Sequence, residues 1–334
     1  MHRPAPTPPF LAQLAARLLR AFLLLLAALG ASASHAQAFP TKPVTLIVPL
    51  PAGGATDVLA RVLGQRLQEA WGQTVVVDFR PGGGTVVGTQ AVARSAPDGH
   101  TLGIILSAHS ANPSLRKSLP YDTLKDLAGV ARIGWSVVAL VAVSGFEADD
   151  VKGLLALARR KPGELQYASL GVGTSTHFAG ELLKSTAGID LLHVPYNGSA
   201  PAYRDLLGGR VPLAFVIMNS AQPHVRAGKL KVLGVTNARR SETYPDYPTV
   251  GESVPGYEIT SWFGLVAAGA TPAPLLQRLS ADLVRVLESA DMRAKLAELG
   301  VDAAPLGGSA FDAFIRAEMD RLGKLARQSG AKLD

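Results

Sequence analysis

Short runs of apolar and β-branched residues alternate along this chain with segments of helical periodicity, and this alternation restricts the fold more than any other feature. The run Val44 to Val48 is followed by an amphipathic segment, Val58 to Trp71, and then by a second short run, Thr74 to Val77. Such alternation is typical of α/β proteins in which helices cover largely parallel sheets. We therefore predict two strands with a helix between them.

A second series of the same kind follows the long apolar run that begins at Val137. Strand-like runs again lead through turns of small residues into helical segments, as in "LQYASL", "GVGTST" and "HFAGELLKSTAG". The part of the chain from Pro272 onward has a strong helical period. The sequence thus predicts two α/β lobes joined by extended strands, with C-terminal helices that pack back on them.

The N-terminal segment has the features of a secretory signal peptide. Basic residues precede an uncharged stretch from Ala21 to Ala36, which ends in the small residues Ser34 and Ala36. The alternative is a membrane anchor, but the strongly apolar part falls short of the roughly 20 residues that a spanning helix needs. We predict that residues 1–36 form a signal peptide and that the exported protein is periplasmic.

Charge and composition exclude several function classes. The formal charge is +7 over 334 residues, three arginines lie in the N-terminal segment, and no cluster of basic residues is interleaved with aromatic ones, so nucleic acid is not an expected partner. The chain has no cysteine, which excludes disulfides and thiol catalysis. Its histidines lack the spacing of metal-binding pairs, and Thr176 stands where a dinucleotide fingerprint has its third glycine. We predict neither a metal nor a cofactor.

Two glycine-rich turns are the best candidates for ligand contacts. The turn Ala52 to Asp57, within "PLPAGGATD", and the turn Gly171 to His177 each precede a helix, where unpaired backbone N–H groups and the helix dipole favour an anion. Each turn has a structural alternative: the glycines can form a tight corner, and Asp57 can be an N-cap or a dipole partner in the first helical turn. His177 can likewise be a buried structural histidine.

An enzyme is the alternative from another functional class. Ser175 and His177 are a close pair of a nucleophile and a base at the start of a predicted helix, and no orienting acid is evident beside them. The phosphate-binding loop and the nucleophile elbow are also absent from the sequence.

An ordered set of motifs covers the whole chain after about Phe39 and resembles the periplasmic solute-binding proteins of the tripartite tricarboxylate transporter system, the Bug or TctC family. The motifs are "FPTKPVTLIVPLPAGGATD", "VVVDFRPGGG", "SAPDGHTL", "LPYD", "KPGELQYASLGVGTSTHFAGELL", "HVPYNGSAPAYRDLLGGRV" and "PHVRAGKLKVLGVT". The resemblance implies a type II-like periplasmic binding protein fold, with a mainly parallel sheet flanked by helices in each lobe. It places residues 39–140 and 260–334 in lobe 1 and residues 141–259 in lobe 2.

The resemblance also implies a function: a non-catalytic receptor that captures a small carboxylate between its lobes and delivers it, as a monomer, to membrane permease subunits. A ligand sensor for a membrane receptor is a further alternative. The family's contacts map here onto Ala52, Gly53, Gly54, Thr56, Asp57, Ser107, Asn112, Gly173, Thr174, Ser175, His177, Tyr196, Ser199, Met218 and Trp262. The chain departs from the family pattern at Thr85, at His100 and in the apolar run Val216 to Met218, which affects the identity of the ligand more than the capture of an anion.

Overall fold

The computed structural model describes residues 39–53 and 55–333, and the elements below belong to the compact unit that begins at Lys42. The signal peptide predicted over residues 1–36 lies outside the described residues. Within the described residues, no helix is both long and apolar enough to cross a membrane.

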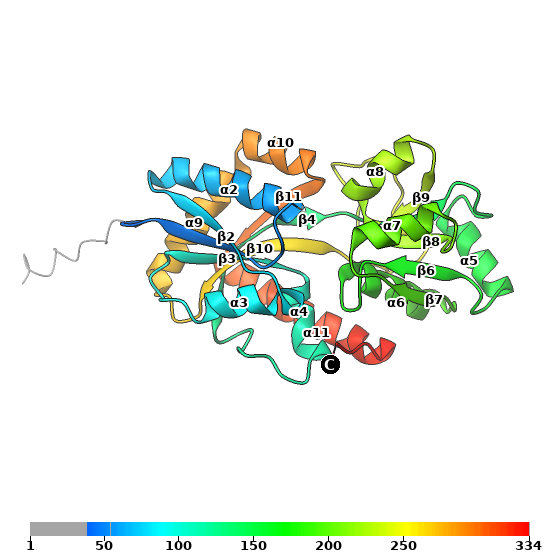
Figure 1. The fold of residues 1–334 in the computed structure, drawn as a ribbon, viewed down its shortest axis with the longest axis horizontal. Helices are drawn as coiled ribbons and strands as arrows, with labels where there is room; N and C mark the ends of the chain where they lie inside the picture. Colours follow the sequence, from blue (N-terminus) through cyan, green and yellow to red (C-terminus); the bar gives the residue numbers. More distant parts are fainter. Residues whose placement is uncertain (1–38, 54, 334) are drawn as a thin grey trace, which may run out of the picture. The chain divides into compact units, whose positions relative to one another are not determined.

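Two sheets organise the chain (Figure 1). The first has the strand order β11 (Val301–Gly307), β4 (Leu127–Ser136), β10 (Ser261–Ala268), β3 (Thr101–Leu106), β1 (Val44–Val48) and β2 (Val75–Phe79). The second has the order β7 (Leu192–Pro195), β6 (Gln166–Ser169), β8 (Leu213–Ile217), β5 (Val138–Val143) and β9 (Leu230–Val235). The predicted two-lobed α/β fold is confirmed.

Both sheets are mixed, however, where we expected mainly parallel ones. In the first sheet β1 pairs in parallel with β2 and β3, whereas β10 and β11 pair antiparallel with their neighbours. In the second sheet β6 pairs in parallel with β7 and β8, whereas β5 is antiparallel to β8 and β9. Of the antiparallel strands, β5 and β10 enter a sheet directly from the other half of the chain, so no helical crossover sets their direction.

Helices cover both sheets. Those associated with the first sheet are α2 (Ala55–Trp71), α3 (Val86–Ala93), α4 (Ala108–Leu115), α9 (Ala273–Glu288), α10 (Ala290–Glu298) and α11 (Gly308–Ser329). Those associated with the second are α5 (Val151–Arg160), α6 (Ser175–Ala187), α7 (Ser199–Leu207) and α8 (Met218–Arg226). Two short 3₁₀ segments, Gly83–Thr85 and Val250–Glu252, complete the secondary structure of the described residues.

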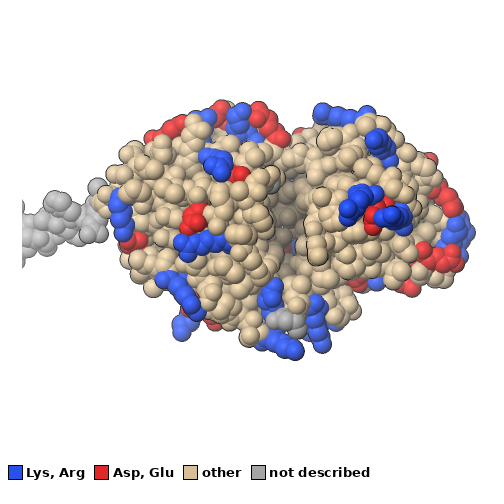
Figure 2. All heavy atoms as spheres, viewed as in Figure 1, with Lys and Arg blue, Asp and Glu red and all other residues tan. Residues whose placement is uncertain are grey.

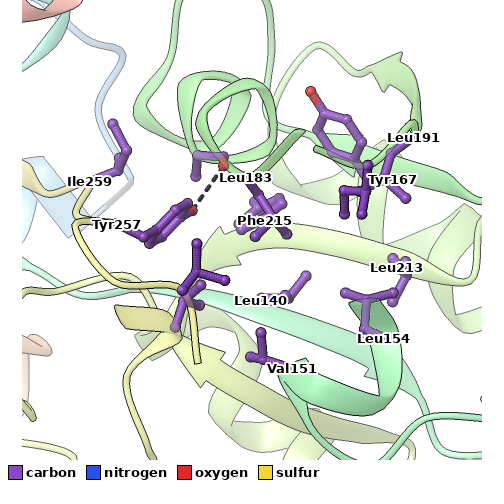
Figure 3. Close-up of a cluster of buried hydrophobic side chains, with 14 of the residues drawn as sticks. Leu140, Val151, Leu154, Tyr167, Leu183, Leu191, Leu213, Phe215, Tyr257 and Ile259 are labelled. Atoms are coloured by element: carbon purple, nitrogen blue, oxygen red, sulfur yellow. Dashed lines mark hydrogen bonds between the residues drawn. The ribbon is translucent and has the colours of Figure 1, made fainter. Parts of the chain in front are cut away.

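A large buried cluster of the described residues crosses from one half of the chain to the other. Figure 3 shows side chains of β5, α5, β6, α6 and β8 meeting there, with the Tyr257 hydroxyl donating to the carbonyl oxygen of Ala179 at 2.8 Å. The same cluster includes Ala111 and Leu115 of α4 and three residues near the end of α11: Leu322, Leu325 and Ala326. The C-terminal half of α11 therefore packs with the second sheet's core.

The lobe boundaries remain a prediction. The chain passes from the first sheet to the second at Val137, between β4 and β5, so the expected boundary between residues 140 and 141 falls inside β5. The expected boundary between residues 259 and 260 lies just before β10.

His109, in the first turn of α4, should make folding stability depend on pH. The side chain is buried, both ring nitrogens lack a hydrogen-bond partner among the described residues, and burial lowers the pKa of His109 from its ordinary 6.5 to about 4. Between these values the unfolded chain binds a proton that the folded chain does not. The free energy of unfolding should therefore fall by up to about 3 kcal/mol as pH falls from 6.5 to about 4, with no further loss from this group below that.

Urea titrations across this pH range measure the effect. His109→Leu should remove this part of the pH dependence, because leucine has no proton to bind. A variant with the same pH dependence as the wild-type protein would show that His109 is not the group responsible.

Candidate functional site

The predicted contact turns follow the carboxyl ends of parallel strands in both sheets. In the first sheet, the turn from Ala52 follows β1, and Ser107 follows the neighbouring strand β3. In the second sheet, β6, β7 and β8 are neighbours and lead into Gly171, Tyr196 and Met218. Figure 2 shows a hollow between the two halves of the described chain, bordered on this face mainly by uncharged residues. The carboxyl ends of parallel strands are where open α/β sheets bind ligands.

In the first turn, the Gly53 N–H already has an acceptor within the protein, the carboxylate of Asp57. Gly53 has a φ of 94°, and its N–H donates to Asp57 Oδ2 at 2.8 Å. Arg61 Nε donates to Asp57 Oδ1 at 2.6 Å. The pKa of Asp57 is lowered, first by the Gly53 amide and also by Arg61. Asp57 thus acts as a carboxylate in the first turn of α2, as one structural alternative predicted, while Ala52 and Gly53 are exposed.

In the second turn, Thr174 caps α6. Its hydroxyl accepts from the His177 N–H and donates to the carbonyl oxygen of Gly171 at 2.7 Å. Gly171 and Gly173 have φ values of 135° and 78°. The N–H groups of Ser175 and Thr176, the first two helical residues, have no acceptor within α6 because of their position. An anion at this helix end would therefore meet donors that the fold leaves available.

The next turn along the sheet edge touches the second turn. Gly198 N–H donates to the carbonyl oxygen of Leu170 at 3.3 Å, and a Cβ on Gly171 would stand 3.3 Å from the carbonyl oxygen of Tyr196. The Tyr196 hydroxyl donates to Asp205, and Ser199 is exposed at the start of α7. Small side chains and exposed backbone therefore form this part of the edge.

Several predicted contact residues are buried. Thr56 is buried in the first turn of α2, and Ser107 precedes α4 with 6% of its surface exposed. Asn112 donates to the carbonyl oxygen of Gly84 at 3.2 Å, which fastens α4 to the turn at Gly83–Thr85. The Asn112 side chain therefore has a structural role within the protein itself.

Met218 and Trp262 lie in the core and not on a cleft wall in this structure. Both have no exposed surface. Trp262 lies edge-on to Phe311 and Phe314, and its indole N–H faces Glu318 at 3.3 Å. The prediction for Trp262 relied on the family resemblance, but in β10 alternate side chains point to opposite faces, and this one points toward α11.

The hydrolase pair predicted from the sequence is not formed. His177 Nδ1 accepts from the Gly173 N–H at 3.2 Å, and no hydrogen bond joins His177 to Ser175. A different pair exists: Ser169 Oγ lies 2.7 Å from His193 Nε2. Ser169 is fully buried, however, and its hydroxyl accepts from the Gly171 N–H at 3.2 Å, so it cannot meet a substrate in this structure.

A polar cluster that was not predicted from the sequence lies beneath the second turn. His177, Glu181 and His193 have ligand-type atoms that all lie within 4.8 Å of one another. The imidazoles of His177 and His193 stack with their centroids 4.4 Å apart. Glu181 accepts from the Tyr167 hydroxyl at 2.8 Å and from Lys184. No local pattern in the sequence indicated it, because His193 is brought beside His177 by the pairing of β6 with β7.

The chain is similar in sequence to several curated proteins over almost its full length. It is 35% identical over 323 residues to Protein BugT of Bordetella pertussis, covering 95% of this chain and 98% of that one. It is 34% identical over 311 residues to a protein of the UPF0065 group encoded between tcbD and tcbE in Pseudomonas sp. strain P51, covering 92% and 93%.

Solved structures show the same similarity. The R. palustris protein Rpa4515, solved with adipate, is 34% identical with a TM-score of 0.77, covering 88% of this chain and 100% of that chain. MatC of Rhodopseudomonas palustris, solved with bound malate, is 29% identical with a TM-score of 0.71, covering 86% and 99%. The periplasmic binding protein BugD is 30% identical with a TM-score of 0.74, covering 88% and 99%.

The family model described as the tripartite tricarboxylate transporter family receptor matches residues 59–331. This range includes both sheets apart from β1. With the fold, the turns at the strand ends and the relatives in agreement, the chain belongs to the receptor family of the tripartite tricarboxylate transporters.

Proposed function

We propose that this protein is a periplasmic receptor that captures a small carboxylate in the hollow between its two lobes and delivers it to the permease subunits of a tripartite transporter. One observation carries the proposal: in both sheets, turns of small residues open onto helix N-termini at the carboxyl ends of neighbouring parallel strands. The relatives solved with adipate and malate support a carboxylate as the ligand.

The candidate contacts differ in what they offer the ligand. Exposed or half-exposed groups that can reach a ligand directly are those of Ala52, Gly53, Thr174, Ser175, Tyr196 and Ser199. Gly54 lies outside the described residues. At the Gly53 turn, a ligand carboxylate must displace Asp57, bridge to it through water, or bring an ammonium group that pairs with it, because two adjacent carboxylates repel. The α6 turn is therefore the stronger site for the first carboxylate.

The proposed protein binds its ligand without converting it, and it acts as an exported monomer after removal of residues 1–36. Burial of Ser169 and the engagement of His177 with Gly173 argue against hydrolysis. A sensor that signals to a membrane receptor would bind its ligand by the same turns. It would differ from a transport receptor only in the membrane protein that it contacts once the ligand is bound.

A panel of ligands tests the proposal by thermal denaturation. We expect at least one of the mono-, di- and tricarboxylates, amino acids and nicotinate to raise the melting temperature, because a ligand at 100 times its Kd adds about 2.7 kcal/mol to the free energy of unfolding. The matched control is the dimethyl ester of each active diacid, which has the same carbon skeleton without the charge and should give no shift.

Two outcomes would contradict the proposal. One is a panel in which no carboxylate shifts the melting temperature of the folded protein. The other is consumption of the bound ligand, followed by NMR of the same mixtures, which would support the enzyme instead.

A further inference from the structure

Two histidines lie directly beneath the turn that leads into α6 and hold its backbone. The N–H of Gly173 donates to His177 Nδ1 at 3.2 Å. The N–H of Gly171 donates to Ser169 Oγ at 3.2 Å, and this oxygen lies 2.7 Å from His193 Nε2. Both glycine amides of the turn are therefore connected to an imidazole, one directly and one through a hydroxyl.

The direction of one of these hydrogen bonds sets the protonation of His177. Since a backbone N–H can only donate, His177 Nδ1 must carry the lone pair and Nε2 the proton. The Ser169 hydroxyl accepts from Gly171 and shares a second hydrogen bond with His193 Nε2, in which either group can be the donor. The His177 ring is therefore neutral in this arrangement.

This protonation argues against a metal ion at His177, Glu181 and His193. A metal at His177 would need the lone pair of Nε2, but that nitrogen carries the proton while Nδ1 accepts from Gly173. Lys184 Nζ lies 3.3 Å from both carboxylate oxygens of Glu181 and already supplies a cation there. Ligand-type atoms of the three residues lie within 4.8 Å of one another, so the Glu181 carboxylate is close enough to interact favourably with the imidazoles.

We propose that His177 and His193 are positioning residues that, as neutral imidazoles, hold the Gly171–Gly173 turn in the conformation that presents the N-terminus of α6 to the ligand. Protonation of His177 replaces the acceptor of the Gly173 N–H by a second donor, so the turn is released and the ligand is bound more weakly in acid. The inference rests on the proposed function for its ligand and on the hydrogen bonds of the turn for its mechanism.

The surroundings of the two rings place the change below the ordinary imidazole pKa of 6.5. Burial lowers the pKa of His193 to about 4 and also lowers the pKa of His177 from its ordinary 6.5. Glu181 favours the protonated rings, whereas Lys184 opposes them, and the two rings oppose each other's protonation. Asp190, before β7, lines a cavity together with the two histidines, Glu181 and Lys184. Tyr167 packs on His193 from β6. The α11 end contributes only the uncharged Ser329 to this cavity.

The direction of the pH effect on ligand binding follows from these lowered pKa values. The folded protein favours neutral rings, so the turn is held at pH 7 and is released as pH falls below 6.5. Ligand affinity should fall over the same range.

Two substitutions at His177 separate positioning from simple packing. In His177→Asn the amide oxygen can replace Nδ1 as the acceptor of the Gly173 N–H, and it does not titrate. In His177→Leu the side chain has a similar size and no acceptor. His224→Leu, on α8 and outside the cluster, is the control for loss of a histidine.

The measurements are hydrogen–deuterium exchange of the peptide that contains Gly171 and Gly173, and affinity for adipate and malate between pH 7 and pH 4.5. At pH 7 we expect His177→Leu to exchange faster at this turn and to bind the probe about tenfold more weakly, as loss of one hydrogen bond implies. At pH 7, His177→Asn should have an exchange rate and an affinity close to those of the wild-type protein. Between pH 7 and pH 4.5 its affinity should fall by less than that of the wild-type protein. His224→Leu should follow the wild-type protein throughout.

Wild-type affinity that is constant from pH 7 to pH 4.5, or a His177→Leu variant with unchanged exchange and affinity, would overturn the inference. If neither adipate nor malate binds any variant while exchange at the turn follows the expected order, the held turn is supported and the choice of a dicarboxylate ligand fails. The two failures are therefore distinguishable.

Discussion

Replacing Trp262 by alanine should lower the free energy of unfolding by about 3–5 kcal/mol, because it removes a large buried aromatic side chain and leaves a cavity. The indole has no exposed surface and contacts Phe311 and Phe314 edge-on, with centroids 5.8 and 5.4 Å away. The substitution also leaves Glu318, a buried residue on α11, without the indole N–H. Denaturant titration measures the loss as a shift of the midpoint.

Trp71→Ala is the matched control. This tryptophan ends α2, is half-buried, and donates its indole N–H to Asp282 at 3.1 Å. The same chemical change should therefore reduce stability less. Trp262→Phe should keep most of the packing and leave ligand affinity unchanged. A Trp262→Phe variant that is stable but has lost affinity would restore the role in ligand binding that the family resemblance implied.

The architecture was predictable where hydrophobic periodicity is strong. The strand at Val44–Val48 and the long helix that ends at Trp71 follow directly from the pattern, and both are present. The predicted C-terminal helical region is divided instead, because Ser289 ends α9 and caps α10, where its side chain accepts from the Met292 N–H. A polar residue of high cap preference inside an amphipathic run was the available signal.

Two strands of the first sheet were missed for a physical reason. β4 is buried on both faces, so its sequence, "LAGVARIGWS", does not alternate between apolar and polar residues. Its glycines allow close approach: a Cβ at Gly129 would lie within 3.0 Å of Phe311. β11 has a register irregularity between Ala303 and Leu306, around a proline, which also hides the strand pattern.

The location of the candidate site was predictable, but its hydrogen bonds were not. Strand–turn–helix order is local, so the turns at Gly53 and Gly173 could be placed at the carboxyl ends of strands. The acceptors of their amides, Asp57 and His177, lie four residues along the chain in each case, and their side-chain conformations depend on the packed structure. His193 reaches the turn only because β6 and β7 are neighbours, which a single sequence does not state.

The two glycine turns should respond differently to the same substitution. Gly53 and Gly173 have φ values of 94° and 78°, so valine at either position adds strain of about 1–3 kcal/mol. A Cβ at Gly53 would have no atom within 4 Å, whereas a Cβ at Gly173 would overlap Leu115 Cδ1 at the end of α4. Gly173→Val should therefore lower the free energy of unfolding by more than Gly53→Val does.

Ligand affinity should show the same order. Gly173→Val displaces the turn that leads into α6, where the available donors are, and should weaken carboxylate binding by at least tenfold, or about 1.4 kcal/mol. Gly53→Val changes a turn whose amide already binds Asp57, so its effect on affinity should be smaller. Calorimetry with the active ligand of the panel measures both.

The overlap with Leu115 provides a direct test of the cause. In Gly173→Ala the added methyl group meets Leu115, so the stability lost in the double variant with Leu115→Ala should be smaller than the sum of the losses in the two single variants, while the strain of the positive φ remains. Strictly additive losses in the two single variants and the double variant would mean that Gly173 does not pack against α4. In that case the second turn would be free to move independently of the first sheet's half, and the weaker binding of Gly173→Val would have to come from backbone strain alone.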